Sequence, residues 1–107
     1  MKERDEGLPT LSGKERLVME LLLEEPGSEK YGLQLVRASR GGLKQGTVYV
    51  TLGRMEEKEF VESREVPPPD SMIGLPRRLY RVTGYGRRVY EAWEVLRKSL
   101  LGLEVRT

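Results

Sequence analysis

The fold of this chain is decided by the stretch QGTVYVTLGRMEEKEFVESREV, residues 45–66, in which the apolar spacing changes from helical to extended. The first part predicts a helix that begins near Gln45, and its inward side chains are spaced four and three residues apart at Val48, Leu52 and Met55. The end of the stretch, FVESREV, alternates apolar with polar residues and is rich in β-formers, which is typical of a strand. A helix followed directly by a strand is therefore predicted for the middle of the chain.

A second alternating segment, RRLYRVT at residues 77–83, predicts a strand antiparallel to the first. Between the two strands PPPDSMIGLP, residues 67–76, is too rich in proline for a regular element and predicts a connecting loop. Thr83 is a good N-cap residue, so a last helix is expected from about Gly84 to roughly Leu103.

Two further helices are predicted before the central stretch. Ser12 and Glu15 have the spacing of a capping box, which begins a helix that ends before Pro26. Its apolar face is expected to contain Leu17, Val18, Leu21 and Leu22. Ser28 is expected to cap a second helix, SEKYGLQLVRAS, which ends at the double glycine 41–42. The inward positions of this second helix are predicted to be Leu33 and Val36.

The order helix, helix, helix, strand, loop, strand, helix predicts a mainly α fold with a two-stranded β wing (α+β), namely a winged helix-turn-helix plus a C-terminal dimerisation helix. We expect a flexible N-terminal arm at 1–10, a winged helix-turn-helix DNA-binding domain at 11–83 and the C-terminal dimerisation helix at 84–107. A chain of 107 residues is long enough for one such domain with a single core.

The residue inventory excludes most catalytic chemistry. The chain has no cysteine and no histidine, so it has no thiol nucleophile, no imidazole base, no disulfide and no zinc site of the usual kind. We therefore expect a protein that is not an enzyme and needs no metal or cofactor. No apolar run approaches the roughly 18–20 residues of a membrane span, and the charged N-terminus is unlike a signal peptide, so a soluble, cytoplasmic protein is expected.

Charge is distributed in blocks along the chain, although the net charge is only +2. Residues 37–54 contain four basic residues and no acid, and residues 71–90 contain five arginines and no acid. Acidic residues are concentrated at 1–31 and 56–65. Two acid-free basic blocks are typical of a surface that meets phosphate, and a solvated charged face is the alternative.

The third predicted helix carries the candidate recognition face, because about 100° of rotation per residue turns one side away from the inward Val48. The predicted DNA contacts on and before this helix are Lys44, Gln45, Thr47, Tyr49, Val50 and Arg54. Among them the apolar Val50 suits a thymine methyl in the major groove. Gly53 indicates a close approach, either by a ligand or by another helix of the protein. Arg77 and Arg78, at the base of the wing, are expected to reach phosphates or the minor groove.

Three stretches together resemble the PadR-like transcriptional regulators, in their short form with one C-terminal helix. These stretches are YGLQLV at 31–36, GTVYVTLGRMEEKEFVESR at 46–64 and RRLYRVTGYGRRVYEAW at 77–93. They match the family pattern of tyrosine and glycine on the second helix, G-T-Φ-Y at the start of the third, and Y-x-Φ-T-x-x-G after the wing. The match spans about residues 12–93, and one departure is Val50, where relatives often carry proline.

The resemblance implies a homodimeric DNA-binding repressor of an inverted-repeat operator, released by a small, often aromatic, effector. By position, Tyr31 resembles the family's phosphate-contacting tyrosine and Tyr49 the tyrosine at the head of the recognition helix. Trp93 resembles a tryptophan that lines a ligand pore between subunits in some relatives. The alternatives are that the two tyrosine rings pack in the core and that Trp93 only packs an interface.

The last predicted helix carries a heptad seam of apolar residues: Val89, Trp93, Leu96, Leu100 and Leu103. A helix of about twenty residues is about 30 Å long, which is more than a small domain covers. A second copy of the chain is therefore expected to pack on the seam, together with Leu17 and Leu21 of the first helix. The alternative is a seam that packs within one chain, against the first helix.

Two functions from different classes are compatible with these residues. The first is a sequence-specific DNA-binding regulator that acts as a homodimer. The alternative is a winged-helix module that binds a partner protein through the exposed third helix, without specific DNA binding. The acid-free stretch at 37–54 favours nucleic acid, because a protein partner would not require it.

Overall fold

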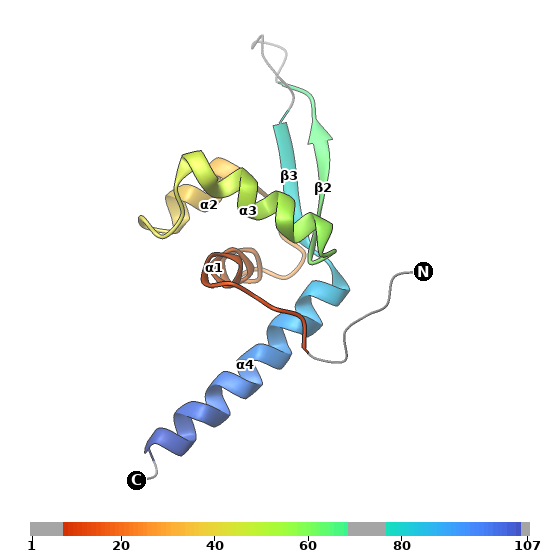
Figure 1. Cartoon of the computed structure of the whole chain (residues 1–107). Coiled ribbons are helices and arrows are strands. Elements are labelled where there is room, and N and C mark those ends of the chain that lie inside the picture. Colours follow the sequence, from red (N-terminus) through yellow and green to blue (C-terminus); the bar gives the residue numbers. More distant parts are fainter. Residues whose placement is uncertain (1–7, 69–76, 106–107) are drawn as a thin grey trace.

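The computed structural model describes residues 8–68 and 77–105, and side chains of the last helix as far as residue 102. Helices and strands follow one another along these residues in nearly the predicted order (Figure 1). Their bounds are α1 Gly13–Leu22, β1 Lys30–Tyr31, α2 Gly32–Ala38, α3 Gln45–Glu57, β2 Val61–Val66, β3 Arg77–Val82 and α4 Gly84–Val105. None of the described helices is both long enough and apolar enough to cross a membrane.

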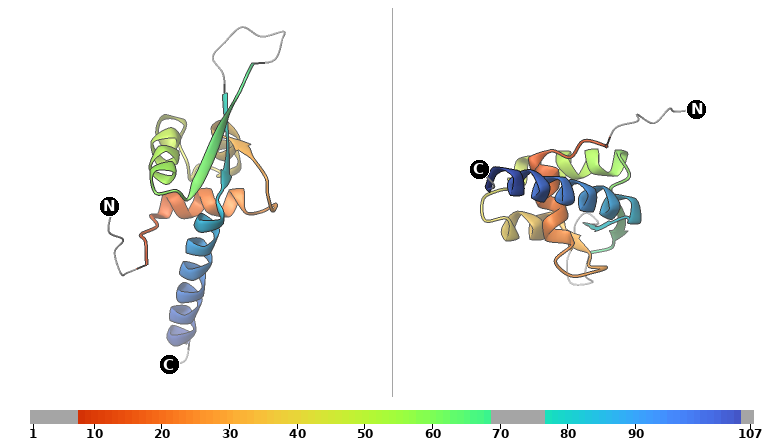
Figure 2. Two further views of the ribbon diagram at one scale, coloured as in Figure 1. Left: turned by 90° about the vertical axis from the view of Figure 1, so that its right-hand side faces the viewer. Right: turned by 90° about the horizontal axis from the view of Figure 1, so that it is seen from below.

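The two predicted strands pair as an antiparallel hairpin that forms the wing. Their register runs from Val61 opposite Val82 to Val66 opposite Arg77. The short strand β1 adds to the other edge of β3, so the sheet has three strands in the order β1-β3-β2. The predicted loop at 67–76 lies outside the described residues except for its first two prolines. Figure 2 shows the wing and α4 extending to opposite sides of the helical domain.

The second helix is shorter than predicted. It begins at Gly32 rather than Ser28, because Lys30 and Tyr31 are extended and pair with β3. The hydroxyl of Ser28 caps no helix and instead donates to the carbonyl of Leu22 at 2.9 Å. Competition from a neighbouring strand has therefore removed the first turn that the sequence pattern predicted.

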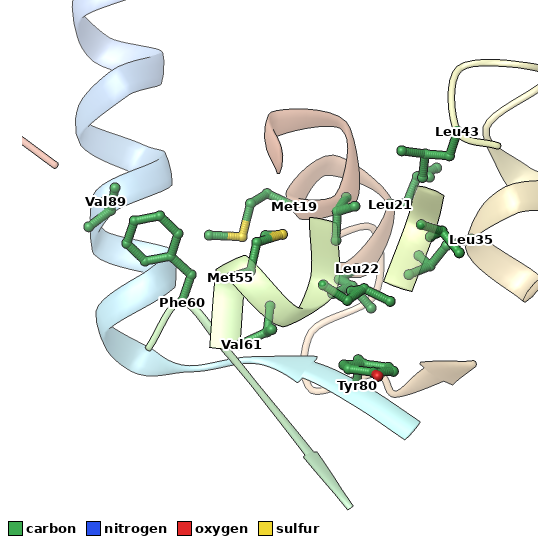
Figure 3. Close-up of a cluster of buried hydrophobic side chains, with 13 residues drawn as sticks. Met19, Leu21, Leu22, Leu35, Leu43, Met55, Phe60, Val61, Tyr80 and Val89 are labelled. Carbon is green, nitrogen blue, oxygen red and sulfur yellow. The ribbon is translucent and has the colours of Figure 1, made fainter. Parts of the chain in front are cut away.

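One hydrophobic core joins the four helices to the sheet (Figure 3). The prediction for α3 is confirmed, because Val48, Leu52 and Met55 have no exposed surface. The prediction for Leu33 on α2 is wrong: its side chain is 41% exposed and lines a surface cleft, while Leu35 is fully buried. Val36 is partly buried against the core, and the other core residues are Val18, Met19, Leu21, Leu22, Leu43, Phe60, Val61, Tyr80 and Val89.

The predicted capping box at the start of α1 is confirmed and does more than cap the helix. The hydroxyl of Ser12 accepts from the backbone N–H of Glu15 at 3.1 Å, and the Ser12 N–H donates to the Glu15 carboxylate at 2.8 Å. Glu15 is only 2% exposed, and Lys58 at the end of α3 donates to both of its oxygens at 2.9 and 3.0 Å. A buried carboxylate with these partners ties the start of α1 to the end of α3.

The junction between the wing and α4 explains the T-x-x-G motif. The Thr83 hydroxyl accepts from the backbone N–H of Gly86 at 2.9 Å, which is the predicted N-cap, and donates to the carbonyl of Glu59 at 2.7 Å. Gly86 is buried against the backbone of Phe60, and a side chain at this position would collide with the Phe60 carbonyl. The motif therefore fixes where α4 leaves the domain.

An ion-pair cluster holds α4 against α1. Glu94 accepts from Arg16 of α1 at 3.0 Å and from Arg97 of its own helix, also at 3.0 Å. These hydrogen bonds, first from Arg97 and then from Arg16, lower the pKa of the Glu94 carboxyl from 4.5 to about 2. The carboxylate is therefore stabilised in the folded chain relative to the unfolded one.

Glu94→Gln is expected to lower the free energy of unfolding by about 1 kcal/mol near neutral pH, since both arginines are partly exposed and water weakens the pair. The folded-state pKa lies below 4.5, so the contribution of the carboxylate is complete above about pH 4.5 and is lost as the pH falls toward 2. Urea unfolding at a series of pH values should show that the difference in free energy of unfolding between the wild type and Glu94→Gln becomes smaller as the pH falls from about 4.5 toward 2. Glu91→Gln, at an exposed position of the same helix, is the control. A difference in free energy of unfolding that does not depend on pH would show that the ionised Glu94 carboxylate is not the source of the stabilisation.

Candidate nucleic-acid interface

A cleft of about 530 Å³ opens between α2, the start of α3 and the base of the wing. Basic and hydrogen-bonding side chains dominate its lining, which consists of Tyr31, Leu33, Gln34, Arg37, Tyr49, Glu65, Arg77, Arg78 and Tyr80. Four of the predicted DNA contacts thus meet in one place, although they come from β1, α3 and β3. The cleft forms because β1 brings the start of α2 against β3, next to the wing.

Tyr49 lies on the outer face of α3 with its ring against the start of α2. Its side chain is 50% exposed, so it does not pack in the core. A Cβ added at Gly32 would lie 2.6 Å from the Tyr49 ring, so a side chain there would have to displace the ring. The glycine at the start of the second helix and the tyrosine of the third are therefore in contact.

The two arginines at the base of the wing have different surroundings. The guanidinium carbon of Arg77 lies 4.4 Å from the centroid of the Tyr31 ring, which is within the range of a cation–π contact. Arg78 instead donates through Nη1 to the hydroxyl of Ser63 at 3.1 Å. Ser63 in turn donates to the carboxylate of Glu56 on α3 at 2.7 Å.

The outer face of α3 continues the polar surface beyond the cleft. Val50 is 55% exposed, and the other predicted contacts that are exposed here are Lys44, Gln45, Thr47 and Arg54. A Cβ added at Gly53 would meet no atom within 4 Å, so no other helix that the structure describes approaches this glycine. The side of α3 that carries Gly53 is therefore open to a partner outside the chain.

Three cleft residues on α2 were not among the predicted contacts: Leu33, Gln34 and Arg37. Arg37 belongs to the acid-free block at 37–54, and this charge pattern was the signal that could have found it. Leu33 was missed because the sequence pattern assigned it to the buried face of α2, whereas Gly32 and Leu35 form that face and leave Leu33 and Gln34 exposed. Glu65 places one acid in the cleft, opposite Arg78 in the β2–β3 register.

Tyr80 closes the inner side of the cleft and is only 5% exposed. Burial, and next the nearby carboxylate of Glu56, raise the pKa of the Tyr80 phenol. The ring therefore stays neutral there. Among the described residues no three acidic side chains are grouped so that they could hold a metal ion.

The predicted apolar seam of α4 is divided into two parts. Val89 is buried in the core of a single chain, as is Leu21 of α1, and Leu17 is partly buried against that core. Farther along α4, Leu96 is 43% exposed and Leu100 is 53% exposed. The side chain of Leu103 lies outside the described residues. An intramolecular seam thus accounts for the first turns of α4, and no described residue covers Leu96 and Leu100 on the later ones.

Trp93 stands at the boundary between these two parts. Its ring packs partly buried against the core, and its indole N–H donates to the carbonyl of Pro9 at 2.7 Å. Pro9, which belongs to the segment predicted to be a flexible arm, is thus in contact with α4, and Lys58 at the end of α3 donates to the carbonyl of Thr10 at 3.5 Å. Residues 1–7 of the predicted arm lie outside the described residues.

Solved structures with the same fold include several bacterial regulators. A PadR-like transcription factor from Bacteroides fragilis aligns with a TM-score of 0.68 and 24% identity over 82% of both chains. A PadR family regulator from Eggerthella lenta aligns with a TM-score of 0.61 and 27% identity over 86% of this chain and 81% of that one. Bacillus subtilis PadR in complex with operator DNA aligns with a TM-score of 0.64 and 16% identity over 75% of this chain and 45% of that one.

No curated protein sequence matches this chain. The model of the transcriptional regulator PadR-like family matches residues 18–92, which include the second half of α1, all of α2 and α3, the wing strands and the first nine residues of α4. This match and the winged-helix structures agree with the resemblance found in the sequence. The chain belongs to the PadR-like family of transcriptional regulators.

Proposed function

We propose that this protein is a homodimeric repressor that binds an inverted-repeat operator and is released from it by a small-molecule effector. The observation that carries the proposal is the single surface formed by the outer face of α3 and the adjoining cleft, where exposed arginines, amides and hydroxyls come together. The operator complex of Bacillus subtilis PadR, which has the same fold, supports duplex DNA as the ligand. Because chromosomal DNA is the target, we place the protein in the cytoplasm.

In this proposal α3 lies in the major groove. Gln45 and Thr47, both exposed at the start of the helix, carry hydrogen-bonding groups for base edges or phosphate. The free N–H groups of the first turn and the positive end of the helix dipole favour a phosphate beside them. The exposed isopropyl group of Val50 suits a thymine methyl. Arg54, exposed further along the helix, is proposed to contact the sugar–phosphate backbone of the DNA.

The cleft and the wing supply contacts to the sugar–phosphate backbone. Arg37, Arg77 and Arg78 are exposed at its edges, and their charges neutralise phosphates without reading sequence. These contacts fix how the domain sits on the duplex, while α3 reads the bases.

The exposed part of α4 supports a dimer. Leu96 and Leu100 lie one helical turn apart on the seam, and both are exposed, at 43% and 53%. A soluble monomer rarely leaves such an apolar patch uncovered. A second copy related by a twofold axis would cover it and would present two recognition helices to two half-sites. An effector is proposed to bind beside Trp93, whose ring lies where this patch begins.

Tyr49→Ala is expected to weaken specific duplex binding by about 1–3 kcal/mol, the size of one good base or phosphate contact. The protein should remain folded, because the ring is half exposed and outside the core. Fluorescence anisotropy with a labelled duplex measures the change. Thr51→Ala is the matched control, since the Thr51 hydroxyl donates to its own helix at the Thr47 carbonyl. An unchanged affinity in folded Tyr49→Ala would remove α3 from the reading surface.

A further inference from the structure

Tyr31 forms a fixed platform at the base of the wing. Its main chain pairs with β3 at Leu79, and its N–H donates to the side-chain oxygen of Gln34 at 2.7 Å. The side chain is partly buried in the cleft wall. On this ring lies the guanidinium of Arg77, 4.4 Å from the centroid.

A guanidinium stacked on a ring keeps its hydrogen-bond donors free. The contact uses the flat face of the group, while the N–H bonds point outward in its plane and match the two oxygens of a phosphate. Among the described residues the Arg77 guanidinium makes no hydrogen bond or ion pair, and it stacks on the Tyr31 ring. Its partner across the strands is the uncharged Val66.

The neighbouring arginine is less free to bind an anion. Nη1 of Arg78 is engaged by Ser63, which is itself bonded to the carboxylate of Glu56. The residue opposite Arg78 in β2 is Glu65, whose negative charge reduces the attraction of this position for phosphate. From the sequence Arg77 and Arg78 are expected to act alike, but in the structure their surroundings differ.

We infer that Arg77 is a preformed clamp for a backbone phosphate of duplex DNA and that Tyr31 is a positioning residue, which acts through the face of its ring rather than through its hydroxyl. Stacking restricts the arginine before DNA arrives, so less side-chain freedom is lost on binding. The inference rests on the proposed function and deepens it by assigning different roles to the residues of one cleft.

Two substitutions at Tyr31 separate the ring from its hydroxyl. Binding to a labelled mixed-sequence duplex is measured by anisotropy for the wild type, Tyr31→Phe and Tyr31→Leu, with thermal unfolding to confirm that each is folded. Tyr31→Phe keeps the stack and should bind within about twofold of the wild type, whereas Tyr31→Leu should bind about three- to tenfold more weakly. If the phenol contacts DNA itself, Tyr31→Phe will lose as much affinity as Tyr31→Leu, and the inference is overturned.

A double-mutant cycle tests whether Tyr31 acts through Arg77. In an Arg77→Ala background Tyr31→Leu should cause no further loss, whereas in an Arg78→Ala background it should cause its full three- to tenfold loss. Equal effects in the two backgrounds would overturn the inference. Arg77→Lys is a second test, in which Tyr31 is unchanged. The variant keeps the positive charge and therefore the salt dependence of binding. It should still bind duplex several-fold more weakly, because an ammonium group lacks the planar pair of donors of the guanidinium.

The wild-type measurement separates this inference from the proposed function. A wild-type protein that binds no duplex at any salt concentration would overturn both. A wild-type protein that binds duplex, with Tyr31→Phe as weak as Tyr31→Leu, would overturn only the role of the Tyr31 ring.

Discussion

Leu96→Glu is expected to produce a folded monomer that no longer binds an inverted-repeat operator at concentrations where the wild type does. Leu96 is 43% exposed in the single chain, so the new carboxylate remains hydrated in the monomer and does not disturb the core. In the dimer it would be buried without a partner, and the twofold axis places it there twice. Full burial of one leucine side chain is worth about 1.5–3 kcal/mol, and the dimer would gain the part of it that comes from the exposed surface of Leu96, once in each subunit. The variant loses this gain and adds two buried carboxylates, which together favour the separate subunits.

Analytical ultracentrifugation at micromolar concentration measures the oligomeric state, and circular dichroism confirms that the variant is folded. Lys98→Glu is the control, because it places the same carboxylate two residues along α4, about 200° around the helix from Leu96. This control should remain dimeric. A wild-type protein that sediments as a monomer of 12.3 kDa would rule out the dimer, and with it the paired half-sites and an effector site between subunits.

Gly86→Ala is expected to destabilise the protein by about 3 kcal/mol or more, at or above the upper end of ordinary overpacking. The added methyl group would collide with the backbone carbonyl of Phe60, which cannot move without separating β2 from α4. Since the total stability of a small domain is about 5–15 kcal/mol, much of it would be lost.

Urea unfolding gives the change in free energy for Gly86→Ala. Gly84→Ala is its control: a Cβ there would meet only the Arg88 guanidinium, at an ordinary distance of 3.6 Å. The control should be about as stable as the wild type, since the position is exposed and alanine favours helix. Equal stability of the two variants would show that the T-x-x-G glycine does not fix the junction.

The sequence predicted correctly those features of the fold that depend on residues only a few positions apart. The capping box of Ser12 and Glu15, the N-cap at Thr83 and the inward spacing on α3 each depend on contacts three or four residues apart. Such contacts are set by helix geometry alone, so they can be read without knowing the rest of the fold. The two long wing strands were predicted for a similar reason, because their alternation is a property of the strand itself.

The features that were missed depend on partners far away in the sequence. Strand β1 exists because β3 offers it an unpaired edge, and its formation removes the first turn predicted for α2. The face of α2 that is buried, with Leu35 inward and Leu33 exposed, depends on how α2 packs against the rest of the chain. Lys58 pairs with Glu15 and Arg77 stacks on Tyr31 across more than forty residues in each case. No local pattern marks these pairs, so the unequal roles of Arg77 and Arg78 required the structure.

The most direct test of a sequence-specific DNA-binding dimer is selection of bound sequences from a random duplex pool by the wild-type protein, followed by a salt titration on the selected site. A twofold dimer should enrich an inverted repeat whose half-site centres are about one helical turn apart, 10–10.5 base pairs, or a multiple of that spacing. Its affinity should also fall with salt at a slope of roughly 0.9 per phosphate contacted. A pool that remains random, with no salt-dependent binding to any duplex, would contradict the account and would favour a protein partner for the exposed face of α3.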